Sequence, residues 1–430
     1  MAVAVRKLFV LLLVVVLFPI DARENKRQPQ NVAGEVSVPA EPFHHELKAF
    51  TDYKQRIEAR GQKIAEQGVL IETLDGREKL AEHNSDTPFN PASVTKLATS
   101  FAALSKFGPD YRFRTDFLAD GNIDPARRLL AGDLVVDGSN DPMFSQASVQ
   151  EVGRGLTQAG ISRVSGALRI SGSFTYFATG YHDRLQPDTS ASKLLAGLRR
   201  SGIRIDGGFA FGERSGTPLL THYSDQLVRI LLFQNAHSSN PVAEVVGAAV
   251  GGPAQIQSLL INNVGIPQSD VYISRASGLD FNRITPDGAL KVLRALIAAL
   301  DRYSLKPEDI MPVAGVDSGT LRSRFSDDNA RGAIVAKTGT LARDGGVSTL
   351  VGIAHTRAGG TLLFAVFDSD GSVRNYRRLQ DTLLEEVIAE EGGGVAASRL
   401  TDALADFAAN SIVQVHYRAG QSPASDRSAD

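Results

Sequence analysis

The secondary-structure pattern of this chain changes twice, near residue 117 and again near residue 222. Between these points, short strand-like segments alternate with Gly, Asn and Pro turn signals, which is typical of a small β-rich unit. After residue 222, apolar residues recur at the spacing of helices. Because 430 residues are too many for one simple core, we predict two or more domains, one of them a β-rich domain at 118–220.

Strand candidates also lie near both ends of the chain. The segment GVLIETLDG at 68–76 comes before the β-rich unit, while GAIVAKTG at 332–339 follows the helical region. Two further strands, TLVGIAHT and TLLFAVFD, flank the turn Ala358-Gly359-Gly360 and predict a hairpin. Amphipathic helices are expected at 44–63 and 373–390. These elements predict an α/β chain, with an α+β sheet flanked by helices plus an all-α part.

The N-terminus has the pattern of an export signal. Two basic residues, Arg6 and Lys7, precede an unbroken apolar run from Leu8 to Phe18, which is too short to span a bilayer comfortably. We therefore expect a signal peptide at 1–22, cleaved near Ala22, and a periplasmic protein. An uncleaved anchor that associates the protein loosely with the membrane is the alternative. The remaining terminal segments are predicted to be a linker and a tail, at 23–40 and 392–430.

Composition excludes several classes of function. The net charge of −2 creates no global field that favours nucleic acid. The chain contains no cysteine, which rules out disulfides, thiolate metal sites and a cysteine nucleophile. The segment FHHEL at 43–47 lacks the second histidine of H-E-x-x-H, and the chain has neither a P-loop nor a dinucleotide-binding glycine pattern. We expect neither a metal nor a cofactor.

Three short motifs carry residue types that serine acyl-transfer chemistry needs: S-x-x-K at Ser93–Lys96, S-x-N at Ser238–Asn240 and K-T-G-T at Lys337–Thr340. On a helix, Ser93 and Lys96 share a face. A serine hydroxyl is a weak nucleophile unless a base takes its proton. A lysine can do this only when neutral, which requires burial or a nearby cation, and Lys337 is a candidate for that cation.

The third motif follows a strand pattern, where Gly339 would let another backbone or a ligand come close. Lys337 and Thr338 can hold a carboxylate. The backbone N–H of Thr340 and that of Ser93 can face a developing oxyanion.

Each motif also has a simpler explanation. S-x-x-K occurs a second time, at Ser190–Lys193, where helix capping explains it. Ser238 and Asn240 lie between two helical patterns, where such residues are usually caps. It is the ordered combination of the three motifs that indicates a catalytic site.

The chain resembles the low-molecular-mass class C penicillin-binding proteins, which are exported D-alanyl-D-alanine carboxypeptidases and endopeptidases. The resemblance covers roughly residues 65 to 390 and extends beyond the three motifs. Four longer stretches carry it: PASVTKLATSFAALSKFGPDYRFRT, AGDLVVDGSNDPMFS, SGLDFNRITPDGAL and PVAGVDSGTLRSRF. It implies a penicillin-binding, β-lactamase-like transpeptidase fold, split into 41–117 and 221–391 by the β-rich insertion.

The resemblance also implies roles for individual residues. Ser93 is acylated, Lys96 accepts its proton, and Ser238 passes the proton to the leaving group. Asn240 contacts the substrate amide, while Lys337 and Thr338 bind the terminal carboxylate. The implied partners are peptidoglycan peptides that end in D-Ala-D-Ala, and β-lactams.

Two departures from the family pattern limit what the resemblance implies. The family has two inserted domains between its first and second motifs, but only 145 positions separate Ser93 from Ser238, so we infer that one insertion is missing. The chain also has no tryptophan in the stretch that recognises diaminopimelate, where TGYHDRL is the nearest remnant. These losses count against an endopeptidase that selects diaminopimelate, and they favour a non-catalytic cell-wall-binding homologue as one alternative to the carboxypeptidase. A β-lactamase-like hydrolase, which shares the serine nucleophile, is the other alternative.

Overall fold

In this computed structural model, residues 47–325, 327–342, 345–405 and 411–416 are described. The predicted signal peptide and linker, at 1–22 and 23–40, lie outside the described residues. Among the residues that are described, no helix is both long enough and apolar enough to cross a bilayer.

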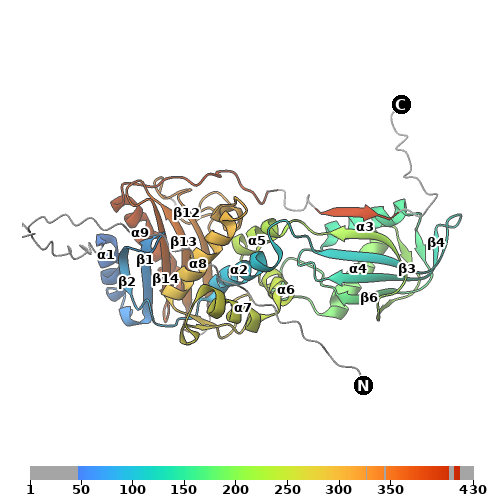
Figure 1. The fold of residues 1–430 in the computed structure, drawn as a ribbon, viewed down its shortest axis with the longest axis horizontal. Helices are drawn as coiled ribbons and strands as arrows, with labels where there is room; N and C mark the ends of the chain where they lie inside the picture. Colours follow the sequence, from blue (N-terminus) through green and yellow to red (C-terminus); the bar gives the residue numbers. More distant parts are fainter. Residues whose placement is uncertain (1–46, 326, 343–344, 406–410, 417–430) are drawn as a thin grey trace, which may run out of the picture. The chain divides into compact units, whose positions relative to one another are not determined.

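A five-stranded antiparallel sheet forms the centre of one part of the molecule (Figure 1). Its strands follow the order β12-β13-β14-β1-β2, so a strand from the N-terminal region pairs with the C-terminal hairpin. This arrangement confirms the sheet that the strand candidates at both ends of the sequence predict. The strands are β1 (Gln67–Thr73), β2 (Lys79–His83), β12 (Ile334–Leu341), β13 (Val347–His355) and β14 (Thr361–Asp368).

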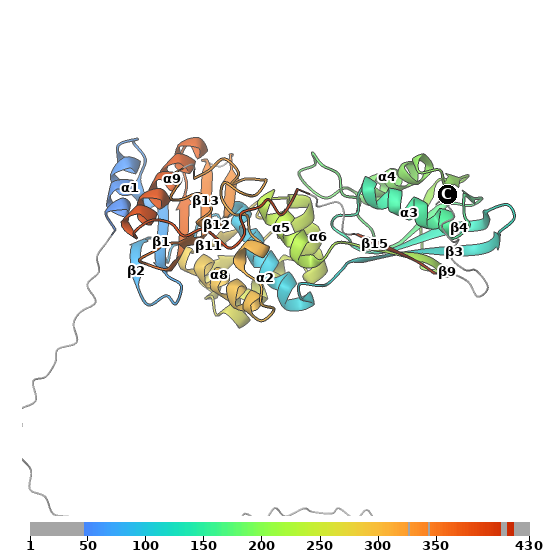
Figure 2. The same cartoon turned by 90° about the horizontal axis from the view of Figure 1, so that it is seen from above.

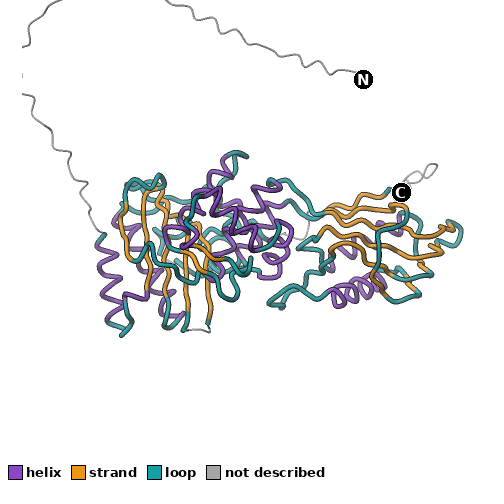
Figure 3. The backbone as a smooth tube through the Cα atoms, turned by 60° about the horizontal axis from the view of Figure 1, so that its bottom comes forward, coloured by secondary structure: helices purple, strands orange, loops and turns teal. Residues whose placement is uncertain are grey.

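Both faces of this sheet are buried by helices, as Figure 3 shows. The central strands therefore read as nearly continuous apolar runs. Helices α1 (Lys48–Glu58) and α9 (Val373–Glu390) share an apolar core with one face. The opposite face packs against α2 (Thr95–Phe107) and α8 (Pro286–Asp301).

The helical part surrounds α2, whose first ten residues are all buried. Its other helices are α5 (Leu227–Ala236), α6 (Asn240–Val250) and α7 (Pro253–Leu259), followed by the strand pair β10 (Val271–Tyr272) and β11 (Arg283–Ile284). Short 3-10 turns lie at Ile64–Glu66, Ala92–Val94, Gln268–Asp270 and Pro307–Asp309, and a π turn lies at Leu260–Val264.

The β-rich region between residues 114 and 223 has an apolar core of its own. Two long strands form a hairpin, and two β-α-β units follow in which the later strands run parallel to β4 or to each other. The boundaries 118–220 remain a prediction. The elements are β3 (Arg114–Asp124), β4 (Leu129–Ser139), α3 (Gln146–Gln158), β5 (Arg163–Val164), β6 (Leu168–Ser173), α4 (Pro187–Arg200), β7 (Arg204–Ile205), β8 (Phe209–Phe211) and β9 (Thr217–Tyr223).

The C-terminal region contains structure that the sequence analysis did not anticipate. Strand β15 (Ile412–Val415) pairs antiparallel with β9 and becomes an edge of the inserted sheet, as Figure 2 shows. Residues 392–405 pack near the five-stranded sheet: Gly394 pairs with Thr356, and Arg399 forms an ion pair with buried Asp317. The described part of the predicted tail is therefore integrated into both parts of the molecule.

Candidate active site

Ser93 lies on a tight turn that is held in place from several sides. The preceding residue, Ala92, has a φ of +48°, which is unusual for a residue with a side chain. The Ala92 N–H donates to Asn90 Oδ1 at 2.9 Å, and Thr95 Oγ1 donates to the Ala92 carbonyl at 2.9 Å. Gly278 approaches so closely that a Cβ there would lie 1.9 Å from that carbonyl oxygen. Such strain persists only where surrounding contacts impose it, often at functional sites.

Lys96 extends from the first turn of α2 toward three oxygen atoms. Its Nζ lies 2.9 Å from Ser93 Oγ, 2.7 Å from Asn240 Oδ1 and 2.6 Å from the Ser277 carbonyl oxygen. The side chain is fully buried. A neutral amine has two N–H donors and one lone pair, so the amide and carbonyl oxygens can take both donors and leave the lone pair for the Ser93 hydroxyl.

Two physical effects favour this neutral form. Burial removes the ammonium from water, and the nearby positive charge of Lys337 repels it; together they hold the pKa of Lys96 well below its usual value of 10.5. Lys337 thus lies close enough to lower the pKa of Lys96, while its role as the activating cation stays a prediction.

The second and third motifs meet through Lys337. Ser238 follows α5 in a left-handed conformation, with a φ of +52°, and its Oγ lies 3.0 Å from Lys337 Nζ. The same ammonium donates to the Thr338 carbonyl at 2.5 Å. Burial lowers the pKa of Lys337 to about 7. The second motif therefore joins the two lysines, because Asn240 contacts Lys96 and Ser238 contacts Lys337.

Strand β12 is the outer strand of its sheet and carries the third motif beside the Ser93 turn. Thr349 Oγ1, on the neighbouring strand, donates to the Pro91 carbonyl at 2.8 Å. A Cβ at Gly339 would lie 2.0 Å from Thr349 Oγ1 and 2.6 Å from the Pro91 oxygen. Glycine is therefore required for this close approach. Thr340 follows it on the same strand, opposite Ser348.

Sequence reasoning missed two contributors to the site. Thr338 Oγ1 donates to Thr320 Oγ1 at 2.8 Å, so a hydroxyl from another loop orients the third motif. The Ser277 carbonyl accepts a hydrogen bond from Lys96, and the Ser277 N–H donates one to Glu244 at 3.0 Å. Both residues lie in stretches that resemble the family, but nothing in their spacing indicates a contact with either lysine.

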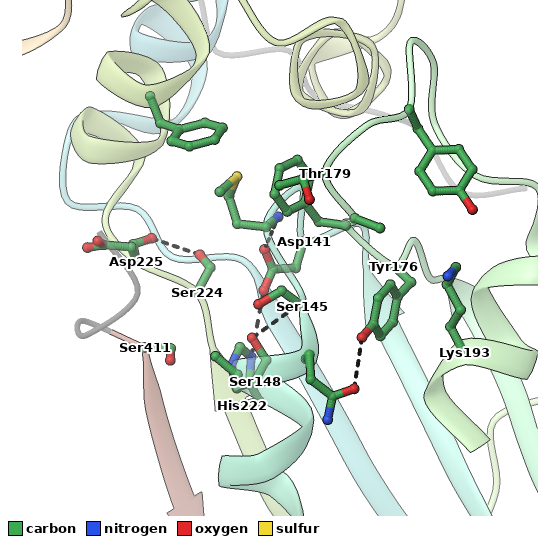
Figure 4. Close-up of a pocket in the computed structure, with 17 residues that line it drawn as sticks. Asp141, Ser145, Ser148, Tyr176, Thr179, Lys193, His222, Ser224, Asp225 and Ser411 are labelled. Atoms are coloured by element: carbon green, nitrogen blue, oxygen red, sulfur yellow. Dashed lines mark hydrogen bonds and ion pairs between the residues drawn. The ribbon is translucent and has the colours of Figure 1, made fainter. Parts of the chain in front are cut away.

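The second S-x-x-K pair has no such arrangement. Ser190 is fully buried and accepts the Tyr176 N–H at 3.2 Å, while Lys193 lies over the rings of Tyr176 and Tyr181. Lys193 borders a cavity of about 570 Å³ that none of the predicted site residues lines (Figure 4). At its edge, buried Asp141 and His222 lie 3.6 Å apart. Helix α4 begins at Pro187, its N-cap is Gln186, and no side chain caps it. Ser190 therefore lies inside the helix, and the capping explanation for this pair is wrong.

The motif TGYHDRL contributes Asp183, which lies near the Ser277 loop. Its carboxylate is 2.6 Å from Arg275, and Glu244 is 3.1 Å from the same guanidinium. These charges line a polar cavity of about 410 Å³.

Comparison with known proteins shows a family that covers most of this chain. The D-Ala-D-Ala carboxypeptidase 3 (S13) family matches residues 54–183 and 181–387. Carboxypeptidase Rv3627c of Mycobacterium tuberculosis is 26% identical over 377 residues, which is 74% of this chain and 78% of that protein. Carboxypeptidase DacB of Mycolicibacterium smegmatis is 27% identical over 356 residues, or 70% and 75% of the two chains.

Solved structures show the same fold. The peptidoglycan endopeptidase Bd3459 of Bdellovibrio bacteriovorus superposes with a TM-score of 0.68 at 21% identity, covering 81% of this chain and 98% of that one. Penicillin-binding protein 4 of Haemophilus influenzae gives 0.65 at 20% identity, covering 79% and 98%. The predicted penicillin-binding fold is therefore confirmed. The chain belongs to the D-Ala-D-Ala carboxypeptidase 3 (S13) family, in agreement with its resemblance to the low-molecular-mass class C penicillin-binding proteins.

Proposed function

We propose that this protein is a serine-type D-Ala-D-Ala carboxypeptidase that acts on peptidoglycan peptides through an acyl-enzyme at Ser93. The family match supports the reaction class. The observation that carries the proposal is the environment of Lys96. Its buried amine has a lowered pKa, two oxygen acceptors for its hydrogens, and the Ser93 hydroxyl at 2.9 Å.

In the acylation step, Lys96 takes the proton of Ser93 as Oγ attacks the carbonyl carbon of the penultimate D-Ala. The tetrahedral oxyanion is stabilised by the N–H groups of Ser93 and Thr340. The C–N bond then breaks, and the terminal D-Ala leaves as its nitrogen receives the proton through Ser238. Water hydrolyses the Ser93 ester, which releases the shortened peptide and restores the hydroxyl.

Substrate orientation depends on the third motif. The Lys337 ammonium and the Thr338 hydroxyl hold the terminal carboxylate, and Asn240 contacts the substrate amide. A bound carboxylate favours the charged form of Lys337 and so offsets the effect of its burial. Penicillins place their carboxylate and reactive carbonyl in the same way, so we expect stable acylation by β-lactams.

The same chemistry extends to cross-linked peptides when the leaving amine belongs to a second stem peptide. We therefore propose endopeptidase activity as an additional property. The predicted export signal would place the enzyme in the periplasm, where this substrate lies.

Labelling with a fluorescent penicillin tests the proposal. We expect one stable adduct per chain, lost in Ser93→Ala, together with release of D-Ala from an acyl-D-Ala-D-Ala peptide. Rapid hydrolysis of the adduct would instead indicate a β-lactamase. A folded protein that forms no adduct and releases no D-Ala would be a non-catalytic wall-binding homologue.

A further inference from the structure

We infer that the C-terminal segment 398–404 positions the carboxylate-binding part of the active site, with Arg399 and Asp402 as positioning residues. This inference rests on the proposed function. The segment holds the loop Asp317–Thr320, and that loop contacts both the third motif and the helix that leads into Ser238.

The loop Asp317–Thr320 contacts the active site on two sides. The Thr320 hydroxyl accepts the hydrogen bond from Thr338 Oγ1 at 2.8 Å. The Thr320 N–H donates to the carbonyl of Ala236, the last residue of α5, at 2.9 Å. Gly319, with a φ of +122°, fits so closely that a Cβ would lie 2.2 Å from the same carbonyl oxygen. A shift of this loop would therefore move Thr338, the end of α5, or both.

Arg399 of the C-terminal segment forms a bidentate ion pair with Asp317, the first residue of this loop. Asp317 is fully buried, and both of its oxygens interact with the Arg399 guanidinium, one of them at 2.8 Å. The Ala403 N–H donates to Asp317 at 3.2 Å, and the Val313 N–H donates at 2.8 Å. A buried carboxylate that loses its cation is costly, so Arg399 is needed to keep this loop in place.

Asp402 binds the next residue. Its Oδ2 accepts the Ser318 N–H at 3.1 Å and the Ser318 hydroxyl in a short hydrogen bond. These bonds hold the pKa of Asp402 below its usual value despite partial burial. Charge-assisted bonds of this kind are stronger than neutral ones, which makes the contact a firm restraint on the loop.

The same segment also packs beneath α5. Leu404 forms a small apolar cluster with Leu232 and Ala236 on that helix. Beyond residue 410, β15 is fixed to β9 in the inserted sheet. The segment thus contacts both the loop and the helix before Ser238. None of its residues lines the Ser93 turn, so its effect on substrate passes through Thr320 and Thr338.

The test compares Asp402→Ala with Ser398→Ala in the full-length protein. Ser398 lies in the same segment but bonds Glu308 instead of the loop, so its variant is the matched control. Each variant is assayed on a D-Ala-D-Ala peptide and on its C-terminal amide. We expect Asp402→Ala to lower kcat/KM roughly 10-fold on the free carboxylate, with little change on the amide, as the loss of the charged hydrogen bonds to Ser318 implies.

The ratio of kcat/KM on the free carboxylate to kcat/KM on the amide separates an effect on substrate positioning from a general loss of stability. If Asp402→Ala leaves the ratio of the two kcat/KM values at its wild-type value, whether or not both values fall, the inference is overturned. The proposed acyl-enzyme at Ser93 would not be affected by that result. If Asp402→Ala does not fold, Ser318→Ala removes the same hydroxyl contact from the loop side, and the same loss of discrimination is expected. Failure of the wild type to form a penicillin adduct would instead count against the proposed function.

Discussion

The partners of one nitrogen atom are compatible with a neutral Lys96. Three oxygens surround it, and two of them, Asn240 Oδ1 and the Ser277 carbonyl, can only accept. The third belongs to Ser93, which has a proton to donate. A neutral amine satisfies all three contacts, whereas a charged one would donate to the nucleophile and weaken it.

Replacing Lys96 with arginine tests this requirement, because a guanidinium stays protonated in proteins. We expect Lys96→Arg to slow penicillin acylation by roughly 10²–10⁴-fold, the usual contribution of a general base. Stopped-flow labelling measures the rate. Lys106→Arg in the last turn of the same helix, where the side chain is exposed, should label at the wild-type rate.

The two lysines also predict the pH profile. Loss of the Lys96 proton should produce the rising limb of kcat/KM. The falling limb should lie near pH 7, because burial lowers the pKa of Lys337 to about 7 and its charged form holds the carboxylate. Bound carboxylate favours that charged form, so the falling limb of kcat should lie at higher pH than that of kcat/KM. Profiles without this separation would contradict the role of Lys337.

At the scale of elements, β12 is placed against the nucleophile turn by a glycine. It is an outer strand. Residues 312–314 pair with its outer edge along residues 334–336, so an extended substrate would have to lie along the third motif itself, as in peptide-binding sheet edges. Its distance from the turn depends on Gly339, which has the Pro91 carbonyl and Thr349 against its Cα.

Gly339→Ala should therefore displace the strand from the Ser93 turn. Because the added Cβ would meet a backbone oxygen at 2.6 Å, we expect at least a roughly 10-fold loss of acylation and a lower melting temperature. Gly208→Ala is the control, since a Cβ there meets nothing within 4 Å. An unchanged acylation rate in Gly339→Ala would show that the strand can move without consequence.

At the scale of the whole molecule, a buried carboxyl ties the terminal helices to the sheet. Asp368 on β14 is fully buried and accepts hydrogen bonds from Tyr53 of α1 and from Gln380 of α9, the latter at 2.7 Å. Burial raises the pKa of this carboxyl to about 7.

This shift predicts a pH dependence of stability. The unfolded chain releases the proton near pH 4, whereas the folded protein keeps it until about pH 7. Between these values the folded state binds more protons, so the contribution of Asp368 to the free energy of unfolding falls as pH rises. Urea unfolding measures this effect: between pH 5 and pH 8, the free energy of unfolding should fall less for Asp368→Asn than for the wild type. Identical losses would contradict this assignment.

Many features of this molecule depend on residues that are close in the sequence, and these features could be predicted from the sequence alone. Strand and helix patterns are short-range, so the hairpin β13-β14 and the helix at 373–390 follow from periodicity. The contact between Ser93 and Lys96 is one helical turn long, and its chemistry could be expected from spacing. The signal peptide remains a prediction that depends on sequence pattern alone.

Other features depend on packing between distant segments, which no local pattern encodes. Ser190 and Lys193 have the same spacing as Ser93 and Lys96. Burial and the charge of Lys337 lower the pKa of Lys96, however, whereas Lys193 lies over the ring of Tyr176. The bonds from Thr338 to Thr320 and from Ser318 to Asp402 join residues whose types are common in any loop. The order of the residue types in the sequence thus predicted a serine and a lysine of one motif in contact. Only the tertiary structure decided which lysine is buried beside a second lysine and which side chains hold the third motif, because burial and electrostatic coupling arise only when remote segments meet.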